Sequence, residues 1–199
     1  MARQQERATR TRAGLIAAAA QHFDETGYNS TSLAQVCETA RTSVGAITFH
    51  FANKADLADA VASEGEARAR AVVDAASTAT APPSTVAELT VAFAELLERD
   101  VLVRAALRLA HERSDVDLLT EVWLPAVAVL VDRASAQGQL RADVSVADVV
   151  DLTEYLTRGA EAWWRTTPPV SENSKRLGRA CELALRGVQP APPTAAADG

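Results

Sequence analysis

Apolar residues recur three and four positions apart along almost the whole chain, which is the spacing of one face of an α-helix. Leu15, Ile16, Ala19 and Phe23 open this pattern. No sustained alternation of apolar and polar residues indicates a β-strand, and no Asn-Gly or Asp-Gly pair indicates a hairpin. We therefore expect an all-α protein whose first helix ends at Gly27, because glycine commonly follows the last turn of a helix.

Three further helices are predicted next, and each follows a side chain that is able to cap it. A hydroxyl or amide oxygen before a helix accepts a hydrogen bond from a free N–H of the first turn. The predicted helices cover residues 33–39, 44–50 and 53 to about 76, with Ser32, Ser43 and Asn53 as the capping residues. A break of only three residues, 40–42, separates the two short helices.

Prolines and small residues divide the rest of the chain. Residues 77–84 form a linker by composition, since two prolines and several hydroxyl residues disfavour a helix. Pro125 is expected to kink or split the helix in which it lies. The helices expected after the linker cover residues 85–98, 101–112, 116–137, 145–166 and 171–187, and residues 188–199 are expected to form a disordered tail.

Composition excludes several classes of protein. Hydrophobic residues make up 48% and charged residues 23% of the chain, which excludes wholesale disorder. Cys37 and Cys181 lie too far apart to indicate a disulfide framework or a zinc site, and the three histidines are scattered. No apolar run reaches the length of a membrane span. Because no catalytic triad, metal cluster or glycine-rich phosphate loop is present, we expect a cytoplasmic protein that is no enzyme and carries no cofactor or metal.

Charge is distributed unevenly. The net charge is −6, yet residues 1–55 carry +2 and residues 56–199 carry −8, and residues 1–12 alone carry +3. A basic end on an acidic protein indicates that the N-terminal end meets a polyanion. A charged tail without a partner explains the same counts, and both interpretations stay open at this point.

Two short helices joined by a tight turn and packed under a longer first helix make a helix-turn-helix. The second short helix is about 10 Å long, so it fits across a major groove that is about 12 Å wide. Thr42, Ser43 and Thr48 are small polar residues that are able to approach phosphates or bases closely. The helix starts at Ser32 and Asn53 are able to point backbone N–H groups at phosphates.

The run Ser32–Leu57 resembles the DNA-binding signature of the tetracycline-repressor (TetR) family of regulators. The resemblance rests on Gly45-Ala46, on Phe49-His50-Phe51 and on the run Asn53–Leu57, and with the preceding helix it covers about residues 9–60. It implies a helix-turn-helix DNA-binding domain over 1–54, a helical ligand-binding and dimerisation domain over 55–187, and a tail over 188–199.

The resemblance also implies which residues meet DNA. The DNA-binding residues that we expect are Thr31, Ser32, Arg41, Thr42, Ser43, Val44, Thr48, His50 and Lys54. Three of them depart from the usual pattern: Arg41 stands in place of glycine, Val44 of a frequent lysine, and Thr48 of a frequent tyrosine. For His50, a phosphate contact and a structural role are both open. The residues expected to form the core here are Phe23, Leu33, Val36, Ile47, Phe49 and Phe51.

The C-terminal half resembles the γ-butyrolactone receptor branch of the family through Asp100–Ala110, Glu121–Trp123 and Thr157-Arg158. In that branch a tryptophan at the position of Trp123 lines the ligand cavity. Its indole suits an apolar lactone tail and offers one N–H donor, although a plain core role explains it too. The other residues expected to line a cavity are Phe93, Leu107, Val127, Thr157 and Trp163.

The last two predicted helices carry long apolar faces, and the adjacent Trp163 and Trp164 must point to different sides, one buried and the other near an interface or the cavity rim. In this family such helices form a four-helix dimer interface, whereas packing within one subunit is the alternative. We therefore expect a homodimeric repressor that binds a pseudo-palindromic double-stranded operator and is released by a small hydrophobic ligand, a γ-butyrolactone type of signal. The alternatives are an antibiotic-responsive or orphan paralogue, or a small-molecule-binding helical protein without DNA binding.

Overall fold

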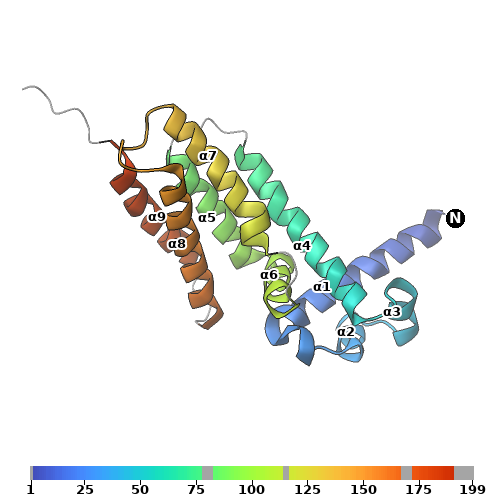
Figure 1. Cartoon of the computed structure of the whole chain (residues 1–199). Helices are drawn as coiled ribbons and strands as arrows, with labels where there is room; N and C mark the ends of the chain where they lie inside the picture. The colour runs from blue at the N-terminus through green and yellow to red at the C-terminus, as the bar shows by residue number, and fades with distance from the viewer. Residues whose placement is uncertain (1, 78–82, 114–116, 167–171, 191–199) are drawn as a thin grey trace, which may run out of the picture. The chain divides into compact units, whose positions relative to one another are not determined.

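The computed structural model describes residues 2–77, 83–113, 117–166 and 172–190 (Figure 1). Within these ranges the regular structure is helical and contains no strand, which confirms the all-α prediction. The helices are α1 (Ala2–Ser30), α2 (Leu33–Thr39), α3 (Val44–His50), α4 (Lys54–Ser77), α5 (Pro83–Arg99), α6 (Val101–Arg113), the π-helical turn η1 (Leu119–Trp123), α7 (Leu124–Ala136), α8 (Val146–Thr166) and α9 (Asn173–Val188).

Prolines explain where the helices of the second half differ from expectation. α5 begins at Pro83, two residues before the start expected near 85, so the prediction of a linker was wrong for Pro83 and Ser84. Proline suits the first turn of a helix because its missing N–H would have no intrahelical partner there. Pro125 splits the helix expected over 116–137 into η1 and α7, which confirms the predicted break. Residues 78–82, 114–116 and 191–199, which include parts of the predicted linker and tail, lie outside the described residues.

The chain divides into two compact units. The first holds the chain up to Arg70 together with residues 99–121, and the second holds residues 71–98 and the chain from Val122 on. α6 belongs to the first unit because it packs along α1. This division by compactness is different from the functional boundary expected after residue 54, which stays a prediction.

The first unit has one continuous apolar core to which α1, α2, α3, α4 and α6 all contribute. Its buried members include Leu15, Ile16, Phe23, Val36, Ile47, Phe51, Leu57, Val61 and Leu109. Gly65 lets α4 approach α6 closely, since a Cβ there would lie 2.6 Å from the carbonyl oxygen of Leu102. The short helices α2 and α3 pack against each other and against α1.

The second unit is built from α5, α7, α8 and α9, with α8 in contact with both α7 and α9. Phe93 of α5 and Trp123 form a ring pair with centroids 6.1 Å apart. Gly178 allows α9 to pack tightly on α5, because a Cβ there would lie 2.3 Å from a methyl group of Val91. The described side chains of α8 and α9 leave apolar groups on the surface as well as in this core.

Candidate nucleic-acid interface and ligand site

Local hydrogen bonds define the starts of both short helices. Ser32 Oγ accepts from the backbone N–H of Gln35 at 3.3 Å, and the Gln35 side chain accepts from the N–H of Ser32 at 2.8 Å. This reciprocal pair is a capping box. Ser43 Oγ accepts from the N–H of Ala46 at 3.2 Å. Both serines are therefore N-caps, as predicted.

An arginine makes the turn between α2 and α3. The N–H of Arg41 donates to the carbonyl of Glu38 at 3.1 Å, and the N–H of Thr42 donates to that of Cys37 at 2.9 Å. This is a Schellman arrangement, in which glycine is usual at the left-handed position. Arg41 occupies that position with φ of 51°, a conformation that costs a residue with a Cβ roughly 1 kcal/mol. The backbone thus keeps the shape that the TetR pattern reaches with glycine, and the exposed guanidinium is added to the surface.

α3 buries one side and exposes the other. Ile47 is fully buried and Phe51, the residue after the helix, is 3% exposed. Arg12 of α1 lies over the Phe51 ring, 5.3 Å from its centroid. Val44, Gly45, Thr48 and Phe49 lie on the exposed side. α3 is therefore anchored through its inner face, and its outer face is free.

The prediction that Phe49 belongs to the core was wrong, because its side chain is 79% exposed. Two positions along an α-helix is a rotation of about 200°, so Phe49 points away from the side on which Ile47 is buried. Its ring packs edge-on against His50, with centroids 5.0 Å apart and an interplanar angle of 83°. The core predictions for Phe23, Val36, Ile47 and Phe51 are confirmed, and Leu33 packs against the core while partly buried.

Two residues of the expected DNA-binding set make contacts inside the protein. Thr31 is 3% exposed, and its hydroxyl donates to the carbonyl of Gly27 at 2.7 Å. Lys54 donates from Nζ to the carbonyls of Tyr28 and Thr31 at 2.8 and 3.0 Å. The same ammonium lies 4.3 Å from the centroid of the Tyr28 ring. These groups join the end of α1 to the start of α4 and lie apart from the exposed face of α3.

The remaining members of that set lie on or near the surface around α3. Ser32, Arg41, Ser43, Val44 and Thr48 are exposed, while Thr42 and His50 are half-buried. The turn and α3 thus bring together Arg41, Thr42, Ser43, Val44 and Thr48, and Ser32 lies at the start of α2.

Three arginines on one face of α1, called here the arginine stripe, were not among the DNA-binding residues expected from the sequence. Arg3, Arg7 and Arg10 are exposed and lie four and three positions apart, which places them on one face of the helix. Arg12 points to another face, where it lies 3.9 Å from Glu64. The sequence shows the spacing of these arginines, but the prediction used only the net charge of residues 1–12 and not the positions of the arginines on the helix.

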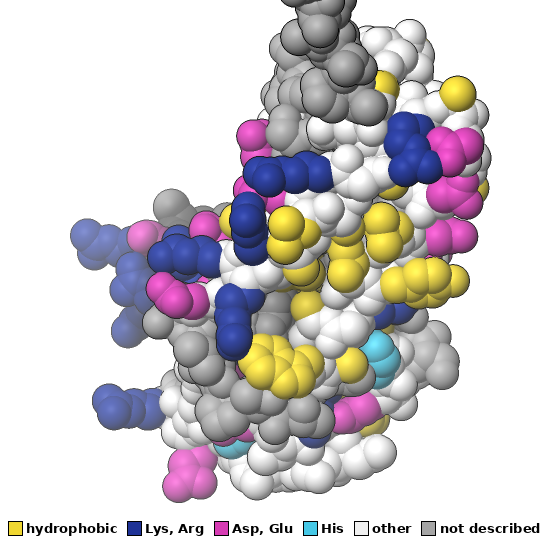
Figure 2. Space-filling model, turned by 90° about the vertical axis from the view of Figure 1, so that its left-hand side faces the viewer, with side chains coloured by type: hydrophobic (Ala, Val, Ile, Leu, Met, Phe, Trp, Pro, Cys, Tyr) yellow, Lys and Arg dark blue, Asp and Glu magenta, His cyan; other side chains and the backbone are white. Residues whose placement is uncertain are grey.

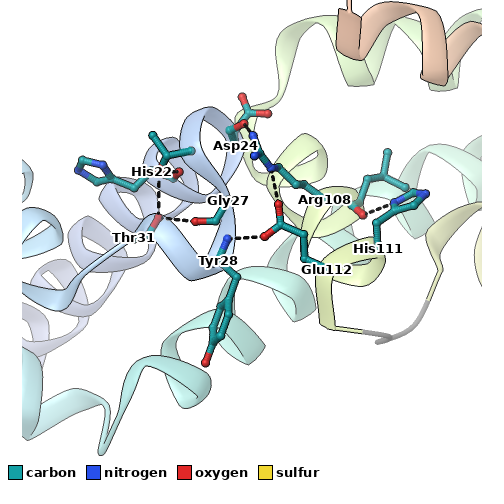
Figure 3. Close-up of polar contacts among 10 residues, drawn as sticks. His22, Asp24, Gly27, Tyr28, Thr31, Arg108, His111 and Glu112 are labelled. Atoms are coloured by element: carbon teal, nitrogen blue, oxygen red, sulfur yellow. Dashed lines mark hydrogen bonds and ion pairs between the residues drawn. The ribbon is translucent and has the colours of Figure 1, made fainter.

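A polar network holds the end of α1 against α6 (Figure 3). The chain turns at Gly27, where φ is 84°, and the N–H of Tyr28 donates to Glu112 Oε2 at 2.6 Å. Arg108 donates to Glu112 Oε1 at 2.8 Å and to the backbone carbonyl of Asp24 at 2.7 Å. The Asp24 carboxylate pairs with Arg104 of α6 at 2.8 Å. α6 therefore fixes the position from which the chain enters α2.

On the ligand side, Trp123 is buried with no exposed surface and packs against Phe93, which is 1% exposed. Within the described residues, the Trp123 indole Nε1 is buried and has no hydrogen-bond partner. Val127, one turn further along, is also fully buried. Buried N–H groups almost always have a partner. An unpaired donor in an apolar setting is therefore a place where an acceptor would be stabilised.

The other residues predicted to bind the ligand differ from Trp123 in their exposure or in the unit to which they belong. Thr157 is 2% exposed, and its hydroxyl donates to the carbonyl of Thr153 at 2.9 Å. Trp163 is 44% exposed, with the Arg176 guanidinium 5.8 Å from its ring centroid. Leu107 is buried within the first unit. The side chain of Trp164 lies outside the described residues.

A groove of about 520 Å³ lies between α5 and α9. Its lining includes the carboxylates of Glu88, Glu95 and Glu182 beside Arg186, and Trp123 is not part of it. The lining mixes apolar side chains with these carboxylates, and carboxylates do not favour a purely hydrophobic ligand. The Trp123 indole, with its unpaired donor in an apolar setting, is therefore the candidate ligand position. Among the described residues, no His/Cys/Asp/Glu group of three or more is arranged to hold a metal ion. None of the described helices has the length and apolarity to cross a membrane.

The Glu112 carboxylate has a depressed pKa. Burial raises the pKa, but the hydrogen bonds from Arg108 and from the N–H of Tyr28, together with the arginine charge, outweigh it and leave the pKa below its usual 4.5. A carboxylate with a lowered folded-state pKa stabilises the fold above the unfolded pKa, and that contribution is lost as pH falls through the folded pKa.

The variant Glu112→Gln is expected to be about 1 kcal/mol less stable than the parent at pH 7, because it removes the charge that holds Arg108. The deficit is expected to shrink as pH falls below 4.5, the usual glutamate pKa, and to disappear as pH falls through the lowered pKa of Glu112 in the folded state. Urea unfolding at several pH values measures it. Glu66→Gln is a control, since it removes only an i,i+4 pair with Arg70 on α4. A deficit that is constant from pH 7 to pH 3 would contradict the assignment.

Comparison with known proteins supports this arrangement. The family model of tetR-type bacterial regulatory proteins matches residues 15–61. The chain is 30% identical to the structure of an ArpA-like γ-butyrolactone receptor, with a TM-score of 0.75 over 92% of this chain and 90% of that chain. It is 29% identical to the TetR family protein CprB from S. coelicolor A3(2), with a TM-score of 0.76 over 95% of this chain and 93% of that chain.

A third similar structure is CprB from Streptomyces coelicolor in complex with its biological operator sequence, with 28% identity and a TM-score of 0.64 over 92% of this chain and all (100%) of that chain. No curated protein matches the sequence significantly. The helix-turn-helix geometry and the 30% identity across almost the full length of a family member lead to one conclusion. The chain belongs to the tetR family of bacterial regulatory proteins and is a DNA-binding regulator.

Proposed function

We propose that this regulator is a homodimeric repressor that a small hydrophobic ligand of the γ-butyrolactone type releases from a pseudo-palindromic operator. The observation that carries the DNA part of the proposal is the helix α3, which is anchored on one side by Ile47 and Phe51 and free on the other. The observation that carries the ligand part is the unpaired buried N–H of Trp123. Similar solved structures include γ-butyrolactone receptors, which supports this ligand class.

In the proposed complex, α3 enters the major groove and the exposed Arg41, Ser43, Val44 and Thr48 meet bases or phosphates. Phosphate contacts supply most of the affinity of such complexes and make it depend on salt. The protein is acidic overall, so this attraction must come from a local patch of basic residues. The arginine stripe at the start of α1 supplies that patch, and we propose that it lies along the DNA backbone.

The variant Arg7→Ala is expected to weaken binding to any duplex and to reduce the steepness of the dependence of log K on log[salt] by about one. Arg70→Ala is the matched control, because it removes the same charge from an exposed ion pair on α4. Fluorescence anisotropy between 50 and 300 mM salt measures both slopes. Equal slopes for the two variants would exclude α1 from the interface. If the parent protein bound no duplex at low salt, the DNA-binding role itself would be overturned in favour of a ligand-binding helical protein.

A second copy of the chain is the proposed occupant of the α8 and α9 surface. Apolar side chains gather on this face with charged groups at its edges (Figure 2). Tyr155, Trp163 and Leu183 are 72%, 44% and 54% exposed there. TetR regulators dimerise, and a two-fold pair presents two α3 helices to the two halves of a pseudo-palindrome. This argument favours pairing through α8 and α9 over packing within one subunit.

The variant Leu183→Glu is expected to be monomeric at micromolar concentration, because a dimer would bury two unpaired carboxylates at its centre. Val129→Glu places the same charge at an apolar site on α7 that is exposed to a similar extent, 46%, and is expected to stay dimeric. Sedimentation velocity measures the mass of each species. A dimer of Leu183→Glu as stable as that of the parent would place the interface elsewhere.

The ligand is proposed to accept a hydrogen bond from Trp123 Nε1 and to lay its apolar part against Phe93 and Val127. A γ-butyrolactone with an alkyl chain offers both a carbonyl acceptor and an apolar tail. An antibiotic with an exposed carbonyl has the same chemistry, so the antibiotic-responsive alternative uses the same donor. An orphan paralogue would leave the N–H without any ligand.

The variant Trp123→Phe tests the donor, since it keeps an aromatic ring in the core and removes the indole N–H. The concentration of a synthetic alkyl γ-butyrolactone needed to release DNA is expected to rise about tenfold, while DNA affinity without lactone is unchanged. Thr153→Ala is a control that removes a buried α8 hydroxyl already bonded to the carbonyl of Val149. If DNA affinity fell together with the lactone response, Trp123 would be structural. If the lactone released no DNA from the parent, the antibiotic-responsive or orphan alternative would replace the lactone assignment.

A further inference from the structure

In the first compact unit, the exposed large apolar side chains that the structure describes lie on α3. Among the described residues of the first compact unit, the large hydrophobic side chains that are exposed are Val44 and Phe49, at 59% and 79%. Both belong to this seven-residue helix. Single exposed hydrophobic residues are common on protein surfaces. Val44 and Phe49 lie five positions apart on one short helix, about 140° around its axis, while every other described large apolar group of the unit is at least partly covered. This concentration favours a partner with apolar groups of its own.

The polar groups on the exposed side of α3 are few and partly used. The Thr48 hydroxyl donates to the carbonyls of Val44 and Gly45, at 3.2 Å each, so its methyl group is the part that faces outward without a bonding requirement. Ser43 Oγ accepts from the backbone as the N-cap. The face carries no amide and no charged side chain, and these are the groups that form bidentate hydrogen bonds with guanine or adenine.

Phe49 makes an aromatic contact although it is exposed. Its ring packs edge-on against His50, whose own ring lies 6.4 Å from that of the buried Phe51. An aromatic side chain has only two side-chain torsions to lose when it is covered, and it offers a large apolar area. Phe49 is therefore suited to contact with another apolar surface.

One base edge in the major groove presents an apolar group, which is the 5-methyl group of thymine. We propose that α3 reads thymine methyl groups through Phe49 and Val44, and that the positions of thymines in each half-site set the specificity of this regulator. The inference rests on the proposed DNA-binding role and adds the chemistry of recognition to it. Hydrogen bonds from Arg41 and Ser43 would then serve orientation more than base choice.

The test starts from the duplex that the parent dimer enriches most from a randomised library. Each thymine of that duplex is replaced in turn by deoxyuridine, which keeps every hydrogen-bonding atom and removes only the methyl group. At the contacted positions the dissociation constant is expected to rise about fourfold per methyl. At the other thymines it is expected to stay unchanged, which provides an internal control.

The variant Phe49→Ala links the effect to the side chain. It is expected to bind the selected duplex about tenfold more weakly while binding random DNA as the parent does. Its loss and the deoxyuridine loss are expected to be non-additive at the position that Phe49 contacts. Phe49→Leu, which keeps an apolar side chain, is expected to retain most of the methyl effect. Val129→Ala shortens an exposed apolar group on α7 and is expected to change neither affinity.

The outcomes separate this inference from the role on which it rests. If no duplex is enriched and none is bound, the DNA-binding role fails. If a duplex is bound tightly but every deoxyuridine substitution leaves the dissociation constant unchanged, methyl reading is wrong and DNA binding stands. Additive losses in Phe49→Ala would overturn the assignment to Phe49.

Discussion

A helix of seven residues is too short to be stable alone in water, so α3 exists because Ile47 and Phe51 are buried under it. These two anchors lie four positions apart and hold the helix by one edge. The same geometry decides which side chains are presented to solvent. Val44, Thr48 and Phe49 are free because the anchors turn them outward, and the surface chemistry of the regulator follows from this packing.

The anchors depend in turn on what holds α1 and α4 in place. Lys54 binds the carbonyls at the end of α1, and Glu112 of α6 accepts from the N–H of Tyr28. Each contact uses a charged group to satisfy a backbone group where the helical pattern of α1 is interrupted at Gly27. Charge-assisted bonds to the backbone are stronger than neutral ones. A displacement of α6 would therefore reach the start of α2 through a few strong bonds rather than through a general loosening of the core.

Local signals in the sequence were enough to predict the helices and their caps. Ser32 and Ser43 cap α2 and α3 through contacts within three residues, and Pro125 breaks its helix by its own chemistry. Side-chain direction depends on tertiary packing and was harder to foresee. Phe49 was predicted to lie in the core because only a packed short helix keeps the two helices at their angle, although its angular position relative to Ile47 already placed it outside.

The residues of the candidate site were also hard to predict where their contacts depend on tertiary packing. The run around α3 was located through its resemblance to a known signature, but the bonds from Lys54 to the carbonyls of Tyr28 and Thr31 join segments more than twenty residues apart and leave no trace in the local sequence pattern. The unpaired Trp123 N–H is likewise a property of the packed structure. The arginine stripe of α1 was an exception, since its spacing is local and could have been read directly.

In the proposed complex, affinity and specificity rest on different physical interactions. The attraction of the α1 arginines for phosphates is screened by salt, whereas contacts between an aromatic ring and a thymine methyl are apolar and are not weakened by ions. Raising the salt concentration therefore removes binding to random DNA faster than it removes the preference for the operator. An acidic protein gains from this division, because its overall charge of −6 opposes binding to DNA in general. The arginine stripe of α1 and the apolar residues of α3 together then give only the operator enough binding free energy to hold the dimer on DNA.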